Sequence, residues 1–433
     1  MPARRKGLLL EKARRRKIDA PAAGILFAAP PCARARKSPR WRALVGEPMP
    51  YRLSRVYNHW DMRDLARRRL PRAIFDYVDY GSEENVAVRD NRAALERIKF
   101  RPRTVNDVSK RDQSITLFGK RRAMPIVIAP TGGAGLCWYD AEVCLARAAA
   151  KAGIPITIAT AATVPMERVA AEATSGYWQQ LYLWNDRALS HQIVERADRA
   201  GAEVLMLTVD TAVGSNREHN ARNDFSNPFK MTPRIACDIA KHPRWLLATM
   251  ARYMLAGGMP RFVNYPEGSQ MRVTGAPIQQ SLSPSINWND VKELRARWKR
   301  IFMLKGVASP EDARRAADHG VDAIVVSNHG GRQLDGAEAP IEVLPEIVDA
   351  VGDRITVLVD SGYRRGGDVV KALALGAKAV LVGRATLFAV AGAGEPGAHR
   401  AIAMFRDEID RTLALCGCTS FADVNRALLR MPR

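Results

Sequence analysis

Eight short apolar runs, separated by stretches with helical patterns, restrict the fold of this chain more than any other feature. They show almost no alternation of apolar and polar residues, which is typical of strands buried on both faces of a parallel sheet. The runs are Ile126–Pro130, Ile156–Thr160, Trp178–Tyr182, Val204–Asp210, Ile301–Gly306, Ala323–His329, Thr356–Gly362 and Ala379–Arg384. Eight such strands, each followed by a helix, predict an α/β fold: a (β/α)8 TIM barrel.

The segments between the runs carry the signals that begin and end helices. Gly153 and Gly376 each follow a helical pattern, at the position where glycine favours a C-cap. Ser309 and Pro310, followed by two acidic residues, are typical of a helix N-terminus. Residues 60–100 also show helical patterns. We expect them to form an N-terminal helical cap that covers the floor of the barrel or contributes to its site.

One connection is far longer than the others. Strand four ends at Asp210 and strand five begins near Ile301, which leaves about ninety residues where roughly two to six are typical. Loops at the carboxyl ends of barrel strands carry function. We therefore expect this insertion, about residues 220–295, to be a lid, a partner surface or a membrane contact.

Part of the insertion has an amphipathic and basic pattern. Leu246, Met250, Tyr253 and Met254 recur at helical spacing within residues 238–260, with basic residues around them. Such a helix either lies on a membrane surface or packs on the barrel. No apolar stretch reaches the length of about 18 residues that a spanning helix needs, so we expect none.

The N-terminal region carries much of the positive charge. Residues 1–50 hold 13 Lys and Arg and three acidic residues, so +10 of the formal net charge of +22 lies there. Three interpretations are open: a solvated tail, a transit-like segment, or a start codon placed too far upstream. The composition becomes ordinary after Met49, which favours the solvated tail or the misplaced start codon. We expect a disordered extension over 1–48 and one enzyme domain over 49–433.

Two partner classes are disfavoured by composition. The basic charge is concentrated in the extension and no aromatic-basic RNA motif is present, so we do not expect a nucleic-acid partner. The six cysteines form no CxxC pair and no metal-ligand spacing. A reduced, cytoplasmic chain without a bound metal is the simplest interpretation.

Polar and ionisable residues gather at the carboxyl ends of the predicted strands. They are Thr131, Thr160, Gln180, Tyr182, Thr208, Asp210, Lys305, Ser327, His329, Asp360 and Arg384. These ends converge on one face of a barrel, where the catalytic sites of this fold lie. Glycine-rich turns with arginines follow strands seven and eight, at residues 360–368 and 382–384, the position of phosphate sites in such barrels. The sequence therefore predicts an active site with a phosphate-binding end.

The segment SNHGGRQLD (Ser327–Asp335) resembles the hallmark motif of the FMN-dependent 2-hydroxy-acid dehydrogenases and oxidases. PTGGAG (Pro130–Gly135) and HPRW (His242–Trp245) are similar to segments of the membrane-associated bacterial branch that oxidises mandelate or lactate. The resemblance extends from about Ser54 to Leu429. It implies the TIM barrel already expected from the strand pattern.

The resemblance also implies a cofactor, FMN, and residues that hold it. They are Pro130, Thr131, Gly132, Gln180, Thr208, Lys305 and Ser327, with Asp360 near the ribityl chain and Arg364, Gly383 and Arg384 at the phosphate. A guanidinium meets a phosphate or carboxylate through two parallel hydrogen bonds, which fits these roles.

Substrate and catalytic residues are implied in the same way. Arg332 and Arg217 would bind the substrate carboxylate with Tyr77 beside them. Tyr182 would donate to the substrate hydroxyl. His329 would be the base, with Asp210 bonded to its other ring nitrogen.

The implied reaction oxidises an L-2-hydroxy acid to the 2-oxo acid. His329 takes either the hydroxyl proton, while hydride passes to the flavin, or the α-proton, which gives a carbanion; the sequence favours neither route. Electrons would then pass from FMN to a membrane quinone or a similar acceptor, or alternatively to oxygen, which makes hydrogen peroxide. The resemblance further implies a homo-tetramer bound peripherally to the inner face of the cell membrane.

Three positions depart from the most frequent family pattern. Ala159 replaces a serine that commonly bonds the flavin, Gly132 replaces a frequent alanine, and Ala161 replaces the bulky aromatic residue of glycolate oxidases. The two small residues leave room for a larger substituent, although a methylene group changes discrimination by only about 1–3 kcal/mol. We therefore expect mandelate-like substrates ahead of lactate-like ones.

Overall fold

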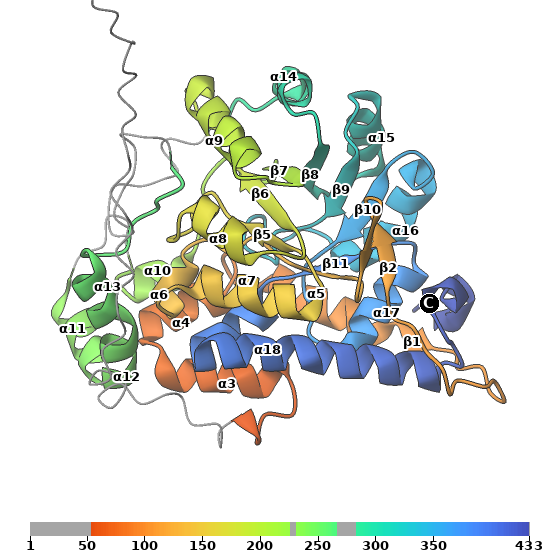
Figure 1. Cartoon of the computed structure of the whole chain (residues 1–433), viewed down its shortest axis with the longest axis horizontal. Coiled ribbons are helices and arrows are strands. Elements are labelled where there is room, and N and C mark those ends of the chain that lie inside the picture. Colours follow the sequence, from red (N-terminus) through yellow and green to blue (C-terminus); the bar gives the residue numbers. More distant parts are fainter. Residues whose placement is uncertain (1–52, 226–230, 266–282, 433) are drawn as a thin grey trace, which may run out of the picture. The chain divides into compact units, whose positions relative to one another are not determined.

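The computed structural model describes residues 53–225, 231–265 and 283–432 (Figure 1). Its centre is a closed barrel of eight parallel strands in the order β10-β11-β4-β5-β6-β7-β8-β9. The strands are β4 (Ile126–Ile128), β5 (Ile156–Ile158), β6 (Tyr177–Leu181), β7 (Val204–Thr208), β8 (Ile301–Val307), β9 (Ala323–Val326), β10 (Thr356–Val359) and β11 (Val380–Val382). Each coincides with one of the eight apolar runs, which confirms the predicted TIM barrel. The extension predicted over residues 1–48 lies outside the described residues.

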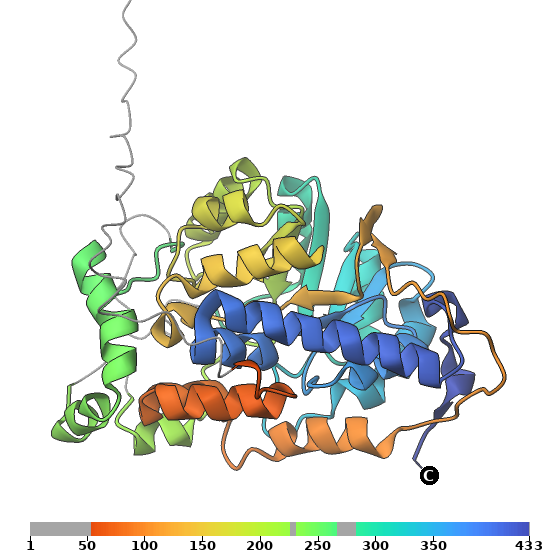
Figure 2. The ribbon, with the colours of Figure 1, turned by 60° about the horizontal axis from the view of Figure 1, so that its bottom comes forward.

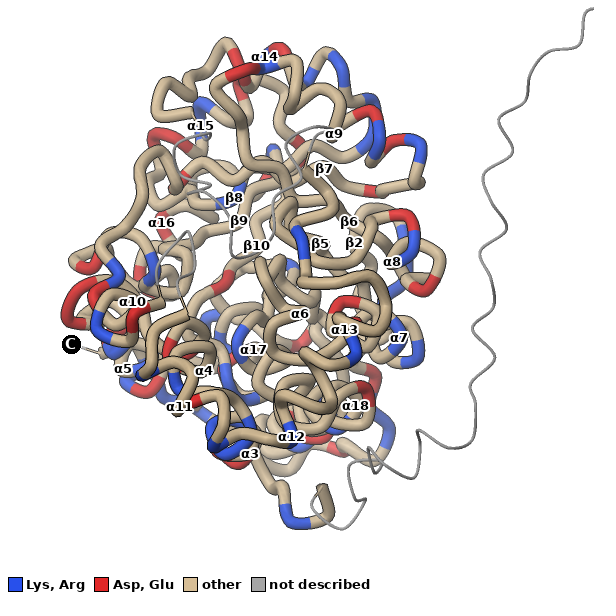
Figure 3. The backbone as a smooth tube through the Cα atoms, turned by 90° about the vertical axis from the view of Figure 1, so that its left-hand side faces the viewer, with Lys and Arg blue, Asp and Glu red and all other residues tan. Residues whose placement is uncertain are grey.

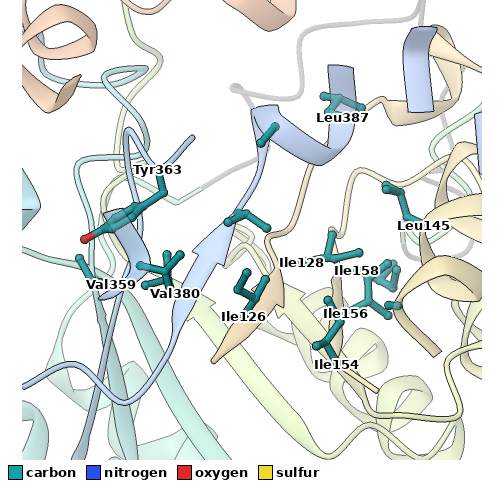
Figure 4. Packing of buried hydrophobic residues seen from close by; sticks show 14 of the residues in the cluster. Ile126, Ile128, Leu145, Ile154, Ile156, Ile158, Val359, Tyr363, Val380 and Leu387 are labelled. Atoms are coloured by element: carbon teal, nitrogen blue, oxygen red, sulfur yellow. The ribbon is translucent and has the colours of Figure 1, made fainter. Parts of the chain in front are cut away.

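The strands are apolar throughout because both of their faces are buried. Val127, Val204 and Met303 point into a core inside the barrel, where they pack with Trp178. Their neighbours along each strand pack outward against the helices; Figure 4 shows Ile126, Ile128, Ile156 and Ile158 from this outer core together with Leu145 and Leu387. Burial on both faces removes the polar alternation that a half-exposed strand would show.

Helices surround the barrel and begin and end at the expected signals. They are α7 (Ala141–Ala152), α8 (Met166–Glu172), α9 (Arg187–Arg199), α14 (Trp288–Arg297), α15 (Pro310–Asp318), α16 (Pro340–Val351), α17 (Gly366–Ala374) and α18 (Arg384–Leu415), with a short helix α6 (Ala134–Cys137) before α7. Gly153 ends α7 at φ 71°. The Ser309 side chain accepts a hydrogen bond from the Asp312 amide at the start of α15. Both predicted helix boundaries are confirmed.

The N-terminal helices are α3 (His59–Arg69), α4 (Arg72–Asp79) and α5 (Val86–Arg97). α3 packs along α18, as Figures 1 and 2 show. α4 brings Tyr77 to the carboxyl face of the barrel. The floor is closed instead by the hairpin β2–β3 (Ile115–Leu117 and Lys120–Arg122), whose buried Leu117 packs among the first residues of the strands. The helical cap was expected either to cover the floor of the barrel or to contribute to its site, and the structure supports the second.

The insertion after β7 contains α10 (Glu218–Arg222), α11 (Pro233–Ala240), α12 (Pro243–Trp245), a π-helical turn η1 (Leu246–Met250) and α13 (Ala251–Ala256). Near the C-terminus lie the 3-10 turns η3 (Phe421–Asp423) and η4 (Arg426–Leu428). The strand that follows them, β12 (Leu429–Arg430), pairs with β1 (Lys99–Phe100). No helix in the described ranges is long and apolar enough to cross a bilayer.

The amphipathic helix predicted within residues 238–260 is wrong in detail. Pro243 has no amide hydrogen to continue α11, so a second helical segment begins there. A π-helical turn, η1, then precedes α13. The predicted apolar stripe is divided: Tyr253 is buried, whereas Leu246 and Met254 are 38% and 56% exposed.

Candidate active site

A cavity of about 770 Å³ opens at the carboxyl ends of the strands. All eight strands or the loops that follow them contribute to its wall. The predicted site residues that line it are Tyr77, Pro130, Thr131, Gly132, Gln180, Tyr182, Thr208, Arg217, Lys305, His329, Arg332, Asp360, Arg364, Gly383 and Arg384. The other two, Asp210 and Ser327, are hydrogen-bonded to the lining residues His329 and Lys305. The geometry therefore brings together all the residues that the family resemblance implied.

His329 and Asp210 form a hydrogen-bonded pair. The distance between His329 Nδ1 and Asp210 Oδ1 is 2.9 Å. Burial lowers the pKa of His329 below its usual value and outweighs the opposite effect of the Asp210 charge. Burial alone would raise the pKa of Asp210, but the charges of His329 and Lys305 hold it below its ordinary range. Asp210 therefore fixes Nδ1 as the protonated nitrogen, and Nε2 is left with a free lone pair to accept a proton.

The loop that carries His329 is held in an unusual conformation. His329 has φ 57°, and Gly330 and Gly331 follow with φ 68° and 72°. A Cβ atom on Gly331 would lie 2.6 Å from the Val88 amide nitrogen, so only glycine fits against α5 there. The loop is further anchored by Asn328, whose side-chain amide exchanges two hydrogen bonds with Asn91.

Lys305 is a buried cation at the centre of the site. Its Nζ donates to Ser327 Oγ at 2.9 Å and pairs with Asp360 Oδ2 at 3.1 Å. Burial would lower the pKa of Lys305, but the charges of Asp360 and Asp210 raise it overall. The ammonium group therefore stays charged and faces the cavity with a fixed direction.

Arg332 and Arg217 flank Tyr77 beside His329. The guanidinium carbons lie 5.0 Å and 5.9 Å from the centre of the Tyr77 ring. Arg332 Nη1 donates to the backbone carbonyls of Tyr77 and Tyr80, at the end of α4. Its other donors, Nε and Nη2, have no hydrogen-bond partner within the described ranges. They are placed to bind a carboxylate.

Arg364 and Arg384 lie after β10 and β11. Arg384 donates to the carbonyls of Val78, Gly330 and Tyr80, at 2.9, 2.7 and 3.3 Å. Arg364 is buried, and its Nε has no hydrogen-bond partner among the described residues. α18 begins at Arg384, directly after Gly383, so free backbone amides also face this end of the cavity.

Like Arg217, the guanidinium groups of Arg332, Arg364 and Arg384 have no anionic partner within the described part of the chain. Burial lowers the pKa of Arg332 and of Arg384 to about 9, and that of Arg364 to about 10. All three remain charged near neutral pH. Buried cations are stable only when an anion accompanies them, so this cavity is built to receive at least two anionic groups.

Residues 66–431 match the family described as FMN-dependent dehydrogenase. The chain belongs to this family. (S)-Mandelate dehydrogenase of Pseudomonas putida is 39% identical over 372 residues, which cover 86% of this chain and 93% of that protein. An L-lactate dehydrogenase of Caulobacter vibrioides is 40% identical over 377 residues, 86% of this chain and 98% of that protein.

The structure of a monotopic membrane protein, (S)-mandelate dehydrogenase, superposes with a TM-score of 0.82. The two are 38% identical over 87% of this chain and 100% of the other. These findings confirm the family that Ser327–Asp335 indicated. This FMN-dependent dehydrogenase is thus an oxidoreductase that acts on 2-hydroxy acids.

The residues of the cavity fit FMN. Arg364, whose Nε has no partner among the described residues, and the amides at the start of α18 suit a phosphate monoester, as does the positive charge of Arg384. The polar edge of the flavin ring needs polar neighbours, and Gln180 is one. Its side chain is fixed in place, because Oε1 accepts from the Thr160 amide and Nε2 donates to Thr208 Oγ1. Lys305 would face the ring as a fixed positive charge.

Small residues form another part of the cavity wall. A Cβ atom on Gly132 would lie 3.2 Å from the Cβ of Ala161, so an added methyl group would narrow the space there. Pro130 and Thr131 precede Gly132 in the loop after β4, and Ala159 lines the cavity from the loop after β5.

Sequence reasoning missed an aromatic wall that the insertion supplies to this FMN-dependent dehydrogenase. Phe225, Phe262 and Tyr265 line the cavity, and the Phe225 ring lies 5.3 Å from that of Tyr77. No periodic pattern marks these residues. The only available signal was the length of the insertion, which predicted a role at this face without identifying residues.

Proposed function

We propose that this enzyme oxidises an L-2-hydroxy acid with an aromatic substituent, of the mandelate type, to the 2-oxo acid. The observation that carries the proposal is the position of the His329–Asp210 pair beside two guanidinium groups in a cavity with aromatic walls and small residues. The same residues would act on lactate. The aromatic wall, Gly132 and Ala161 favour the larger substrate.

The substrate carboxylate would bind between Arg332 and Arg217. Arg332 offers Nε and Nη2 for a bidentate contact, since Nη1 is held by the carbonyls of α4. Binding a carboxylate here also stabilises two guanidinium groups that otherwise repel each other. The contact would place the α-carbon and its hydroxyl near His329.

His329 would take a proton from the substrate through Nε2. Its lowered pKa keeps the imidazole neutral, and therefore basic, near pH 7. Asp210 would stabilise the imidazolium that forms. Burial raises the pKa of Tyr182 to about 12, so its hydroxyl stays protonated and can donate to the oxygen that becomes the carbonyl. When bound, FMN supplies the two-electron acceptor that this oxidation requires.

We also propose that the insertion attaches the enzyme to the inner face of the cell membrane, where a quinone can accept the electrons. Leu247, Met254 and Leu255 are exposed apolar side chains on η1 and α13. Figure 3 shows Lys and Arg on the neighbouring helices α3 and α12. Exposed apolar residues next to basic ones are typical of helices that lie on an anionic bilayer.

The membrane contact is tested by a double substitution, Leu247→Asp with Leu255→Asp. We expect the wild-type protein to sediment with vesicles that contain anionic lipid and the variant to stay in the supernatant. Both proteins should keep FMN and oxidise substrate with a soluble artificial acceptor. Wild-type protein that remains wholly in the supernatant would refute this part of the proposal.

Substrate and acceptor are tested together by steady-state kinetics. We expect kcat/KM to be highest for (S)-mandelate, lower for L-lactate and lowest for glycolate. Rates with a quinone analogue should exceed those with oxygen. Rapid peroxide formation under air would instead identify an oxygen-using oxidase, and a preference for glycolate would overturn the role of the aromatic wall.

A further inference from the structure

A buried asparagine in the insertion joins two walls of the cavity. Asn264 is 0% exposed and does not itself line the cavity. Its near neighbours along the chain, Phe262 and Tyr265, do line it and belong to the aromatic wall. A buried asparagine needs partners for both its amide oxygen and its amide nitrogen. These partners show what the residue holds in place.

Both partners are backbone groups of the loop after β5. Asn264 Oδ1 accepts from the Met166 amide at 2.8 Å, and Nδ2 donates to the Val164 carbonyl at 3.0 Å. Met166 is the first residue of α8, and Pro165 before it offers no side-chain cap. The insertion therefore supplies a partner for an amide that the start of a helix leaves free. Only one orientation of the side-chain amide satisfies both contacts.

The loop that Asn264 holds carries part of the small-residue wall, which consists of Gly132, Ala159 and Ala161. Ala159 and Ala161 belong to this loop and line the cavity. The Ala161 carbonyl accepts from the Gly133 amide at 2.9 Å, and a Cβ atom on Gly132 would lie 3.2 Å from that of Ala161. The position of the loop therefore sets how much room remains beside Gly132.

A second contact from the insertion reaches the same loop. Tyr253 of α13 is buried, and its hydroxyl lies 3.3 Å from Thr163 Oγ1. Thr163 is also held by the barrel, because Glu142 of α7 accepts from both its amide and its hydroxyl. The barrel thus anchors the loop at Thr163, and Asn264 anchors the end of the loop to the insertion.

The aromatic wall is fixed to Asn264 through the chain and through packing. The rings of Phe262 and Tyr265 lie 5.3 Å apart, and the Trp184 ring meets Tyr265 edge-on at 5.0 Å. All three residues are buried. Because Asn264 lies between Phe262 and Tyr265 in the sequence, its two hydrogen bonds also fix where this wall stands relative to the loop after β5.

We propose that Asn264 is a positioning residue that sets the spacing between the aromatic wall and the small-residue wall, and with it the preference for the α-substituent of the substrate. The inference rests on the proposed function, in which these walls surround the substituent while Arg332 and Arg217 bind the carboxylate. A displaced wall would weaken the binding of a large substituent and leave the proton transfer to His329 intact. Such a loss appears in KM and not in kcat.

The test measures kcat and KM for (S)-mandelate and for L-lactate in the wild-type holoenzyme and in Asn264→Ala. The methyl group of lactate does not span the space between the walls, so its constants should change by less than about twofold. For (S)-mandelate we expect KM to rise about tenfold with little change in kcat, which is the scale on which apolar pockets discriminate. The ratio of the two kcat/KM values should fall accordingly. FMN absorption reports whether the variant is folded and loaded.

A second variant, Asn264→Asp, keeps the size of the side chain and disturbs the packing less. Its carboxylate can still accept from the Met166 amide, but in the ionised form it has no hydrogen to donate to the Val164 carbonyl. We expect its ratio of kcat/KM values to lie between those of the wild type and Asn264→Ala.

A matched control separates positioning from a general loss of stability. Ser309→Ala removes the side-chain cap of α15, a helix none of whose residues lines the cavity. This variant should have a lower Tm, as the loss of a helix cap predicts, and an unchanged ratio of kcat/KM values. A change of the ratio as large as that in Asn264→Ala would overturn the inference.

The outcomes distinguish this inference from the proposed function. If both Asn264 variants keep FMN and the wild-type ratio, the inference alone is overturned. Equal losses with both acids, or failure of both variants to hold FMN, also overturn it, because Asn264 then supports the fold or the cofactor. A wild-type enzyme with a higher kcat/KM for L-lactate overturns the aromatic substrate class, while a changed ratio in Asn264→Ala would still support the positioning role.

Discussion

The strand ends and the insertion build the site in different ways. The strand ends supply cations, the His329–Asp210 pair and the polar groups around Lys305, each held by backbone carbonyls, carboxylates or hydroxyls. The insertion supplies Phe262 and Tyr265, held mainly by contacts between rings. In the function proposed above, the barrel would perform the chemistry, and the insertion would select the substrate and attach the enzyme to the membrane.

The largest loss of activity is expected from a substitution among the strand-end residues. His329→Gln removes the group that we propose takes the substrate proton, so the rate of flavin reduction should fall by at least about 10⁴-fold, the upper range for general base catalysis. FMN should remain bound, because the residues that face its phosphate are unchanged. Single-turnover reduction by (S)-mandelate measures this, and a variant that retains most of its rate would exclude His329 as the base.

Arg332→Lys should have the next largest effect. A lysine cannot keep two contacts with the carbonyls of Tyr77 and Tyr80 and also meet a carboxylate bidentately. We expect kcat/KM to fall about 100-fold for every 2-hydroxy acid, whatever its substituent. A loss confined to aryl substrates would break the division between the two regions.

The strand-end residues could be predicted because the fold fixes them. Once eight buried strands are recognised, residues such as Lys305 and Asp360 must converge at their carboxyl ends. The insertion has no repeating pattern, and the residues of its expected apolar stripe are divided between the interior, where Tyr253 lies, and the surface, where Met254 lies. Phe262 and Tyr265 reach the cavity through packing that no local spacing encodes.

The pH dependence of kcat/KM tests the electrostatic coupling between His329 and Asp210. Only neutral His329 can act as base, and burial holds its pKa below the usual imidazole value, so kcat/KM should be constant at neutral pH and fall only on further acidification. In Asp210→Asn, the charge that raises the pKa of His329 is lost, and the acidic limb should move to still lower pH. An acidic limb that lies above the usual pKa of an imidazole in the wild type would contradict this environment.

The smallest change in kinetics is expected from a substitution at the contact between the insertion and the barrel. The ring of His219 in α10 stacks on that of Tyr80 at 3.6 Å, and its Nε2 lies 3.2 Å from Asn85 Nδ2. This contact holds the segment with Arg217 against the carbonyl that supports Arg332. Removing an aromatic pair costs about 0.5–1.5 kcal/mol. His219→Ala should therefore raise KM by a few-fold with less change in kcat.

A matched variant gives the control for that prediction. His219→Phe keeps the stacked ring and loses only the contact with Asn85, so its KM should lie between those of the wild type and His219→Ala. If both variants change kcat and leave KM unaltered, the contact does not position Arg217.

The central claim is that a neutral imidazole and paired guanidinium groups present a 2-hydroxy acid to bound FMN at the mouth of this barrel. Its most direct test is anaerobic titration of the purified holoprotein with (S)-mandelate, followed by visible absorption. The account predicts a yellow protein whose flavin bleaches fully with one equivalent of the acid. A protein that binds no FMN, or whose bound FMN no 2-hydroxy acid reduces, would contradict it.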